Sequence, residues 1–134
     1  LAREGGDKVQ RQMLKSKIHR ATVTDCDVDY IGSITIDTEL MAGADMITNE
    51  QVYVWDVDNG SRFVTYVIDG EPGSGTMQVN GAAAHLVEPG HKIIVATFGS
   101  YDEKDLEHYD PVVVHVDDDN RAIAIDSHPE VLLK

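Results

Sequence analysis

The strongest constraint on the fold is a β-hairpin signal near the middle of the chain. Residues 51–57 and 62–68 are rich in Val, Tyr, Phe and Trp, which is typical of half-buried strands. They are joined through Asp58-Asn59-Gly60, and Asn-Gly is the pair that best tolerates the positive φ angles of a two-residue hairpin turn. The sequence therefore predicts a fold based on a sheet that contains this hairpin.

Other short apolar runs, separated by turn residues, extend the pattern along the chain. They predict strands at 13–24, 30–37, 76–79 and 91–101, a second hairpin from 110–116 and 121–125, and turns at 25–29 and 70–75. A short helix is expected over 38–45, with Asp37 as its N-cap. Many short strands with little helix are typical of a closed β-barrel, because closure removes exposed strand edges.

Length and cysteine content limit the class of protein. A chain of 134 residues, 42% of them hydrophobic, is long enough to bury the core of one domain. We expect a single domain over 13–126, preceded by a disordered leader or cloning remnant at 1–12 and followed by a tail at 127–134. The only cysteine, Cys26, cannot form a disulfide within the chain, and no signal peptide or membrane-length apolar run occurs. A soluble, cytoplasmic protein is expected.

The basic residues are few and unevenly distributed. The formal net charge is −13, and between residues 21 and 100 the only basic side chains are Arg62 and Lys92. Such an acidic surface repels nucleic acid and anionic lipid. Neither nucleic acid nor a membrane is therefore expected as a partner. Counter-charges for a small anionic ligand must come from a short set: Lys15, Lys17, Arg20, Arg62 and Lys92. Even spacing along the strand at 13–24 predicts that Lys15, Lys17, His19 and Ala21 share one face.

Several common kinds of site lack support in the sequence. The six histidines stand outside the spacings typical of metal ligands, such as His-x-His, so no metal is predicted. No Gly-x-Ser-x-Gly elbow occurs, which argues against an ordinary serine hydrolase. The glycine-rich stretch 70–75 lacks the Lys-Ser/Thr ending of a phosphate-binding loop and is expected to be a turn.

The pair Gly32-Ser33 interrupts an otherwise apolar, β-branched strand. Glycine inside a strand usually marks a bulge, a bend or a close backbone approach. The alternative is that the Gly32–Ser33 peptide bond is itself reactive, with its carbonyl carbon open to attack by the Ser33 hydroxyl. The two residues alone leave both interpretations open.

Four segments in the same order, 15–24, 30–37, 59–66 and 79–85, resemble the pyruvoyl-dependent aspartate 1-decarboxylase family. The resemblance covers roughly residues 13–120. It implies a mainly β fold, a double-psi β-barrel with short helices, assembled as a homotetramer. It also implies an inactive precursor that cuts itself between Gly32 and Ser33, with a maturation factor as a partner to consider.

The resemblance further implies the chemistry. A pyruvoyl group made from Ser33 would form a Schiff base with L-aspartate, which loses CO2 to give β-alanine for pantothenate and coenzyme A biosynthesis. Neither a metal nor PLP is needed. In this reading Tyr66 is the proton donor, and the residues that support processing are Tyr30, Thr65 and Asn80.

The same resemblance assigns substrate-binding roles to Lys17, Arg62, Asn80, Gly81 and Ala82, and supporting roles to His19 and Trp55. Arg62 also stands out without it, because a guanidinium pairs well with a carboxylate. Clamping both carboxylates of aspartate equally would stabilise the ground state as much as the transition state, so Lys17 and Arg62 are expected to act unequally. Two alternatives remain: a double-psi barrel that binds a ligand without cleaving, and a pyruvoyl decarboxylase of another amino acid.

Overall fold

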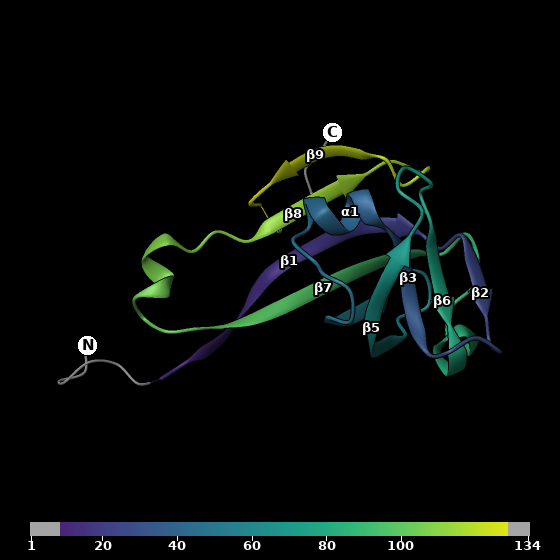
Figure 1. The fold of residues 1–134 in the computed structure, drawn as a ribbon, viewed down its shortest axis with the longest axis horizontal. Coiled ribbons are helices and arrows are strands. Elements are labelled where there is room, and N and C mark those ends of the chain that lie inside the picture. The colour runs from purple at the N-terminus through teal and green to yellow at the C-terminus, as the bar shows by residue number, and fades with distance from the viewer. Residues whose placement is uncertain (1–8, 129–134) are drawn as a thin grey trace.

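The computed structural model describes residues 9–128 and consists mainly of strands (Figure 1). The strands are β1 Arg11–Thr22, β2 Asp25–Asp27, β3 Ser33–Asp37, β4 Gln51–Asp56, β5 Arg62–Gly70, β6 Met77–Asn80, β7 Lys92–Tyr101, β8 Val112–Val116 and β9 Ala122–Asp126. One α-helix, α1 Thr38–Gly43, and two 3₁₀ helices, η1 Gly81–His85 and η2 Asp105–His108, complete the fold. None of the helices in the described part of the chain has the length and apolar character needed to cross a membrane.

The strands form one sheet in the order β2-β6-β3-β5-β4-β7-β1-β8-β9. Three pairs are parallel, β1 with β8, β2 with β6 and β3 with β5, and the others are antiparallel. This mainly β architecture confirms the predicted class and is consistent with a double-psi barrel. The expectation of a closed barrel is not met within the described residues, because the two end strands of the sheet, β2 and β9, do not pair with each other.

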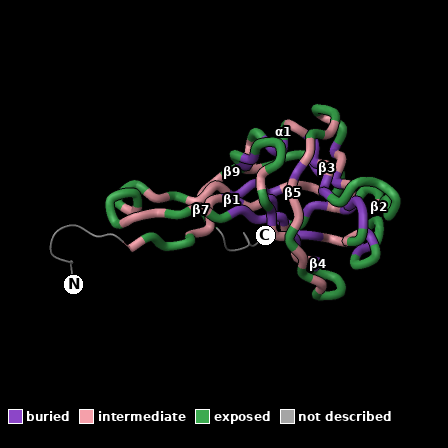
Figure 2. Tube along the Cα trace, turned by 60° about the horizontal axis from the view of Figure 1, so that its bottom comes forward, coloured by how far each residue is buried: buried purple, intermediate pink, exposed green. Residues whose placement is uncertain are grey.

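The molecule has a compact body and a projecting arm (Figure 1). The arm contains the beginning of β1, the end of β7 and the segment with η2. Figure 2 shows that buried residues are concentrated in the body, whereas the arm is mostly intermediate or exposed. The largest fully buried side chains belong to the body: Ile18, Ile34, Ile36, Met77, Ile93, Val23, Val52, Val54, Val67, Val79, Val95 and Val113.

The two predicted hairpins are confirmed. β4 and β5 pair from Gln51 opposite Tyr66 to Trp55 opposite Arg62, and Gly60 in their turn has φ 80°. The second hairpin pairs β8 with β9. The predicted N-cap is also confirmed, since the Asp37 carboxylate accepts a 2.8 Å hydrogen bond from the backbone nitrogen of Glu39.

Other element boundaries differ from the expectation. The strand predicted at 30–37 begins at Ser33, because Tyr30–Gly32 lies outside any ladder. The turn predicted at 25–29 contains β2, which pairs with β6. The helix ends at Gly43 rather than at 45. β1 begins at Arg11, two residues before the expected start, because its first residues pair with the end of β7.

The single face predicted for Lys15, Lys17, His19 and Ala21 is also corrected. Register shifts interrupt β1 between Leu14 and Ser16 and again between Ile18 and Ala21, and Arg20 has φ 63°. Each bulge adds a residue and breaks the alternation of faces. Most of the leader, 1–8, and most of the tail, 129–134, lie outside the described residues.

Candidate active site

A polar face on β3 and β6 holds the boundary between Gly32 and Ser33. In this antiparallel pair Ser33 lies opposite Asn80, and Thr35 lies opposite Gln78. Side chains alternate along a strand, so these four share one face, and we call them the polar quartet. Their neighbours on the two strands are fully buried in the core: Ile34, Ile36, Met77 and Val79.

Ser33 is the first residue of β3 and is only 1% exposed. Its hydroxyl donates a 3.0 Å hydrogen bond to the carbonyl oxygen of Ile31. The same Oγ accepts a 3.0 Å hydrogen bond from Nδ2 of Asn80, which is fully buried. The hydroxyl is therefore fixed on both its donor and its acceptor side, next to the peptide bond that precedes it.

Gly81 brings the backbone of η1 against Gly32. A Cβ added at Gly81 would lie 2.6 Å from the Cα of Gly32 and 2.9 Å from its nitrogen, and the φ of Gly81 is 74°. Any larger residue would therefore push the two segments apart as well as strain its own backbone. A Cβ added at Gly32, by contrast, would meet nothing within 4 Å. The segment before Ser33 therefore packs against Gly81 on one side, while the position that a Cβ of Gly32 would occupy is empty.

β5 carries the other residues expected near the cleavage point. It runs parallel to β3 with Ile34 paired to Val67, so Tyr66 precedes Val67 as Ser33 precedes Ile34. Tyr66 and its neighbour Thr65 are both half-buried. Tyr30 is 49% exposed and lies in the bend before β3. The structure thus brings Tyr66 and Ser33 to the same level of two adjacent strands.

Arg62 lies in a different place, at the start of β5 and opposite Trp55. Its guanidinium carbon is 5.6 Å from the centroid of the Trp55 ring, within the range of a cation–π contact. Both line a cavity of about 510 Å³, together with Gln12, Tyr53, Phe63, Val64 and Phe98. A cation above an aromatic wall suits a ligand with a carboxylate. Ala82, in contrast, lies on η1 beside Gly81 and is exposed.

Lys17 lies far along the sheet from both groups. It pairs with Ala96 of β7 on one side and with Val113 of β8 on the other. In the strand order β7 and β4 separate β1 from β5, so the path along the sheet from β1 to β5 is about 14 Å. A single chain does not join Lys17 to the polar quartet through neighbouring strands.

Two of the other basic candidates already have acidic partners. Lys15 Nζ is 2.7 Å from Glu50 Oε2, and Lys92 Nζ is 2.7 Å from Asp118 Oδ1. These two ammonium groups are engaged in ion pairs, whereas Arg62 is the cation among the residues that line the aromatic cavity.

His19 is 8% exposed, and within residues 9–128 neither ring nitrogen has a hydrogen-bond partner. Its ring centroid is 6.1 Å from that of His115. Burial, followed by the nearby charges of Lys17 and Arg20, lowers the pKa of His19 from 6.5 to about 4. The ring is therefore neutral near pH 7, and it offers no positive charge to a carboxylate.

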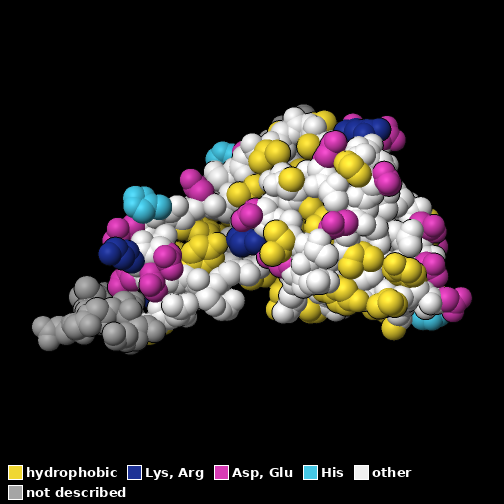
Figure 3. Space-filling view, viewed as in Figure 1, with side chains coloured by type: hydrophobic (Ala, Val, Ile, Leu, Met, Phe, Trp, Pro, Cys, Tyr) yellow, Lys and Arg dark blue, Asp and Glu magenta, His cyan; other side chains and the backbone are white. Residues whose placement is uncertain are grey.

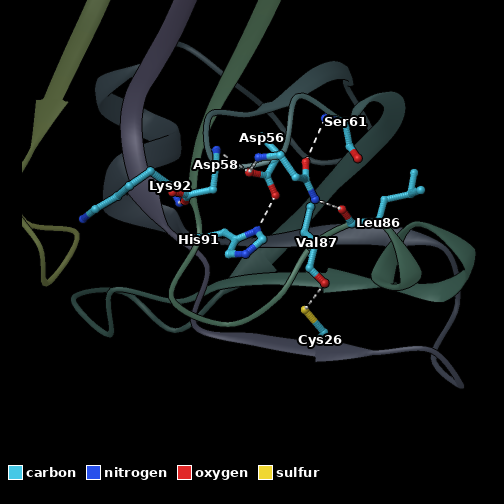
Figure 4. A network of polar contacts seen from close by, with 9 residues as sticks. Cys26, Asp56, Asp58, Ser61, Leu86, Val87, His91 and Lys92 are labelled. Carbon is cyan, nitrogen blue, oxygen red and sulfur yellow. Dashed lines mark hydrogen bonds and ion pairs between the residues drawn. The ribbon is translucent and has the colours of Figure 1, made fainter.

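One cluster in the described residues, absent from the sequence-based predictions, has a metal-like composition. Asp56, Asp58 and His91 place their ligand atoms within 4.8 Å of one another (Figure 4). However, Asp56 Oδ1 accepts hydrogen bonds from the backbone nitrogens of Asp58 and Asn59, and its Oδ2 is 2.6 Å from His91 Nδ1. Through these contacts the cluster holds the β4–β5 turn against the segment before β7.

The sequence-based site missed Gln78 and Thr35. Gln78 Nε2 donates a 2.7 Å hydrogen bond to Asn80 Oδ1, and Asn80 Nδ2 donates a 3.0 Å hydrogen bond to Thr35 Oγ1. The available signal was their spacing, because each stands two residues from a predicted site residue on a strand. The pairing of the two strands was the missing information.

Comparison with known proteins agrees with this arrangement. The sequence matches the model of the family described as aspartate decarboxylase over residues 9–123. It is 54% identical over 121 residues to the aspartate 1-decarboxylase of Mycolicibacterium smegmatis, an alignment that covers 90% of this chain and 89% of that protein. The chain therefore belongs to the aspartate decarboxylase family.

Proposed function

We propose that this chain cuts itself between Gly32 and Ser33 and then decarboxylates L-aspartate to β-alanine and CO2, the reaction that supplies β-alanine for pantothenate. The single observation that carries the proposal is the Ser33 hydroxyl, which is buried beside the Gly32–Ser33 bond and held by Asn80. In a member of this family, this arrangement fits a nucleophile.

Self-cleavage begins with attack of Ser33 Oγ on the carbonyl carbon of Gly32. The C–N bond breaks as the new C–O bond forms, and the hydroxyl proton passes to the released amine. The resulting ester then loses its carboxylate, at Gly32, together with the Cα proton of residue 33. Water adds to the remaining double-bonded residue and ammonia leaves, so the new chain begins with a pyruvoyl group. The step needs no oxidant or reductant.

The residues around Ser33 suit this change. The polar quartet supplies a donor, Asn80 Nδ2, that holds the attacking oxygen of Ser33. Gly81 permits close contact with Gly32. Once formed, the pyruvoyl group supplies a ketone that withdraws electrons from a bound amino acid as its carboxylate departs.

The remaining work belongs to side chains of this protein. Arg62 binds one carboxylate of aspartate in the cavity beside Trp55. Tyr66, level with Ser33 on the adjacent strand, returns a proton to the substrate carbon after CO2 leaves. Asn80, Gly81 and Ala82 contact the substrate from the end of β6 and the start of η1.

Lys17 acts from a second copy of the chain. The sheet separates it from β5 by two strands, so we assign the Lys17 contact to a neighbouring subunit of a homotetramer. Large exposed apolar side chains give such an assembly surfaces to cover, among them Ile31, Val64 and Leu86. Figure 3 shows hydrophobic side chains gathered along the lower margin of the body.

We propose that the enzyme works in the cytoplasm and uses no metal or PLP, and that a maturation factor can bind the uncut chain and speed its cleavage. The test incubates purified protein and follows intact mass together with CO2 release from aspartate and from glutamate. Cleavage after Gly32 with preference for aspartate is the expected result. Uncut chain that still binds small acids would favour a binding module, and preference for glutamate would favour another decarboxylase.

A further inference from the structure

We propose that Gln78 is a positioning residue for self-cleavage, because it sets the direction of the Asn80 amide and so aims the Asn80 NH2 group at Ser33. The inference rests on the proposed function, since it concerns the rate at which the chain cuts itself. Gln78 touches no reacting atom. It acts through Asn80.

The geometry begins with the ladder between β3 and β6. Gln78 and Asn80 stand two residues apart on β6, so both side chains belong to the polar face of this pair. Gln78 Nε2 lies 2.7 Å from Asn80 Oδ1 and donates to it. This contact occupies the oxygen end of the Asn80 amide.

The nitrogen end of the same amide is then directed at the hydroxyls of β3. Asn80 Nδ2 is 3.0 Å from Ser33 Oγ and 3.0 Å from Thr35 Oγ1. An NH2 group has two protons, so the two hydroxyls use both of them. Since the Ser33 proton points to the carbonyl oxygen of Ile31, Ser33 needs a donor as its second partner.

Rotation of the Asn80 amide by a half turn would exchange its oxygen and nitrogen ends. Ser33 would then face an acceptor, and its own proton would be drawn to Asn80 instead of Ile31. The attacking oxygen of Ser33 would lose the N–H that now holds it, and with it the orientation from which it reaches Gly32. Rotation of Asn80 alone is disfavoured, because two donors would then face each other, and the rotated arrangement requires the Gln78 amide to turn as well.

The position can be changed without disturbing the core. Gln78 is half-buried, whereas its neighbours Met77 and Val79 are fully buried. Gln78 also lies beside Asp25 of β2, so a charge introduced at 78 needs a matched opposite charge as a control. Lysine can only donate and glutamate can only accept, so this pair tests the direction of the hydrogen bond, and the uncharged Gln78→Met gives the rate with neither donor nor acceptor.

The experiment compares Gln78→Lys, Gln78→Met and Gln78→Glu with the unmutated chain. Freshly prepared uncut protein is incubated, and the half-time of cleavage after Gly32 is followed by intact mass, with the melting temperature recorded for each variant. Gln78→Lys should cleave within about threefold of the unmutated rate, Gln78→Met several-fold more slowly, and Gln78→Glu at least about tenfold more slowly. Gln10→Glu, an exposed residue before β1, carries the same charge change and should leave the rate unaltered.

A merely structural role predicts a different order, in which the rate follows the melting temperature. The inference is overturned if Gln78→Glu cleaves as fast as the unmutated chain, or if Lys and Glu slow cleavage equally. Should a variant at 78 fail to fold, Thr35→Val tests the same amide: loss of its acceptor should slow cleavage about two- to threefold, and an unchanged rate contradicts the inference. An unmutated chain that never cleaves overturns the proposed function itself.

Discussion

The polar quartet and the Arg62 cavity are built in opposite ways. Ser33 and Asn80 are buried, electrically neutral and joined by hydrogen bonds to defined partners. Arg62 is exposed, positively charged and held against an aromatic ring at the turn end of the β4–β5 hairpin. One region fixes atoms of the chain itself, and the other leaves a charge available to a ligand.

This difference teaches where the two activities reside. Both hydrogen bonds of the Ser33 hydroxyl come from its own chain, one from the segment before β3 and one from β6, so we expect self-cleavage to need no second copy. We propose that the carboxylate-binding side chains, Arg62 and Lys17, act only in the assembled protein, because they lie on strands that are separated in the sheet. Substitutions should therefore separate into those that stop cleavage and those that spare it but reduce turnover.

Ser33→Ala gives the largest expected effect. Without the hydroxyl no nucleophile faces Gly32, so cleavage and CO2 release should both fall below detection. Intact mass and a CO2 assay measure the two losses. Ser100→Ala, on the arm, is the matched control and should leave both cleavage and CO2 release unchanged. Cleavage of Ser33→Ala after Gly32 would show that another group attacks the bond.

Arg62→Ala should separate the two regions. Loss of a guanidinium that pairs with a carboxylate costs about 3 kcal/mol, or roughly 100-fold in kcat/KM for aspartate. The half-time of cleavage should stay the same, because Arg62 does not contact the polar quartet. Arg62→Lys should restore only part of the activity, since an ammonium lacks the planar fork. Slow cleavage in Arg62→Ala would break the separation.

Gly81→Ala tests the close contact between Gly81 and Gly32. A methyl group 2.6 Å from the Cα of Gly32 must push the cleavage segment away, so cleavage should slow by about tenfold or more. Gly90→Ala is the control, because Gly90 has φ 94° but nothing within 4 Å of an added Cβ. Both variants should lose stability of about 1 kcal/mol or more from backbone strain, measured by denaturant unfolding. Equal cleavage rates in the two variants would mean that contact at Gly32 is unimportant.

His91→Gln gives the smallest expected effect. We expect it to change stability alone, through the contact of His91 with Asp56 at the β4–β5 turn. The hydrogen bond to Asp56 raises the pKa of His91, with Asp58 and Glu88 adding to the effect. A raised pKa stabilises the fold fully below the ordinary value of 6.5, and the gain is lost as pH rises through the folded pKa. The melting temperature of His91→Gln should fall a few degrees below the unmutated value near pH 6 and match it near pH 9.

His108→Gln, on η2, serves as the control for that pH series and should follow the unmutated chain throughout. A stability difference for His91→Gln that grows toward pH 9 would contradict the assigned sign.

Local signals in the sequence were enough for much of the fold. Asn59-Gly60 predicts the β4–β5 hairpin because the turn joins strands that are adjacent in the sequence, and Asp37 predicts a cap because the contact spans two positions. The bulges in β1 were not predictable in this way, since they depend on pairing with β7 far along the chain.

The site follows the same rule. The resemblance to a family drew attention to Ser33 and Asn80, but Gln78 and Thr35 become visible only when β3 and β6 are placed in register. The fastening of Asp56 by His91 joins residues 35 positions apart and also required the structure.

Intact-protein mass spectrometry of the unmutated chain, before and after incubation with a carbonyl reagent such as phenylhydrazine, detects self-cleavage and the pyruvoyl group in one experiment. We expect one fragment that ends at Gly32 and a second that begins at residue 33, lighter than a serine-initiated fragment by one ammonia and able to take up the reagent. Full-length chain alone, or a second fragment that begins with unchanged serine and ignores the reagent, would contradict this expectation.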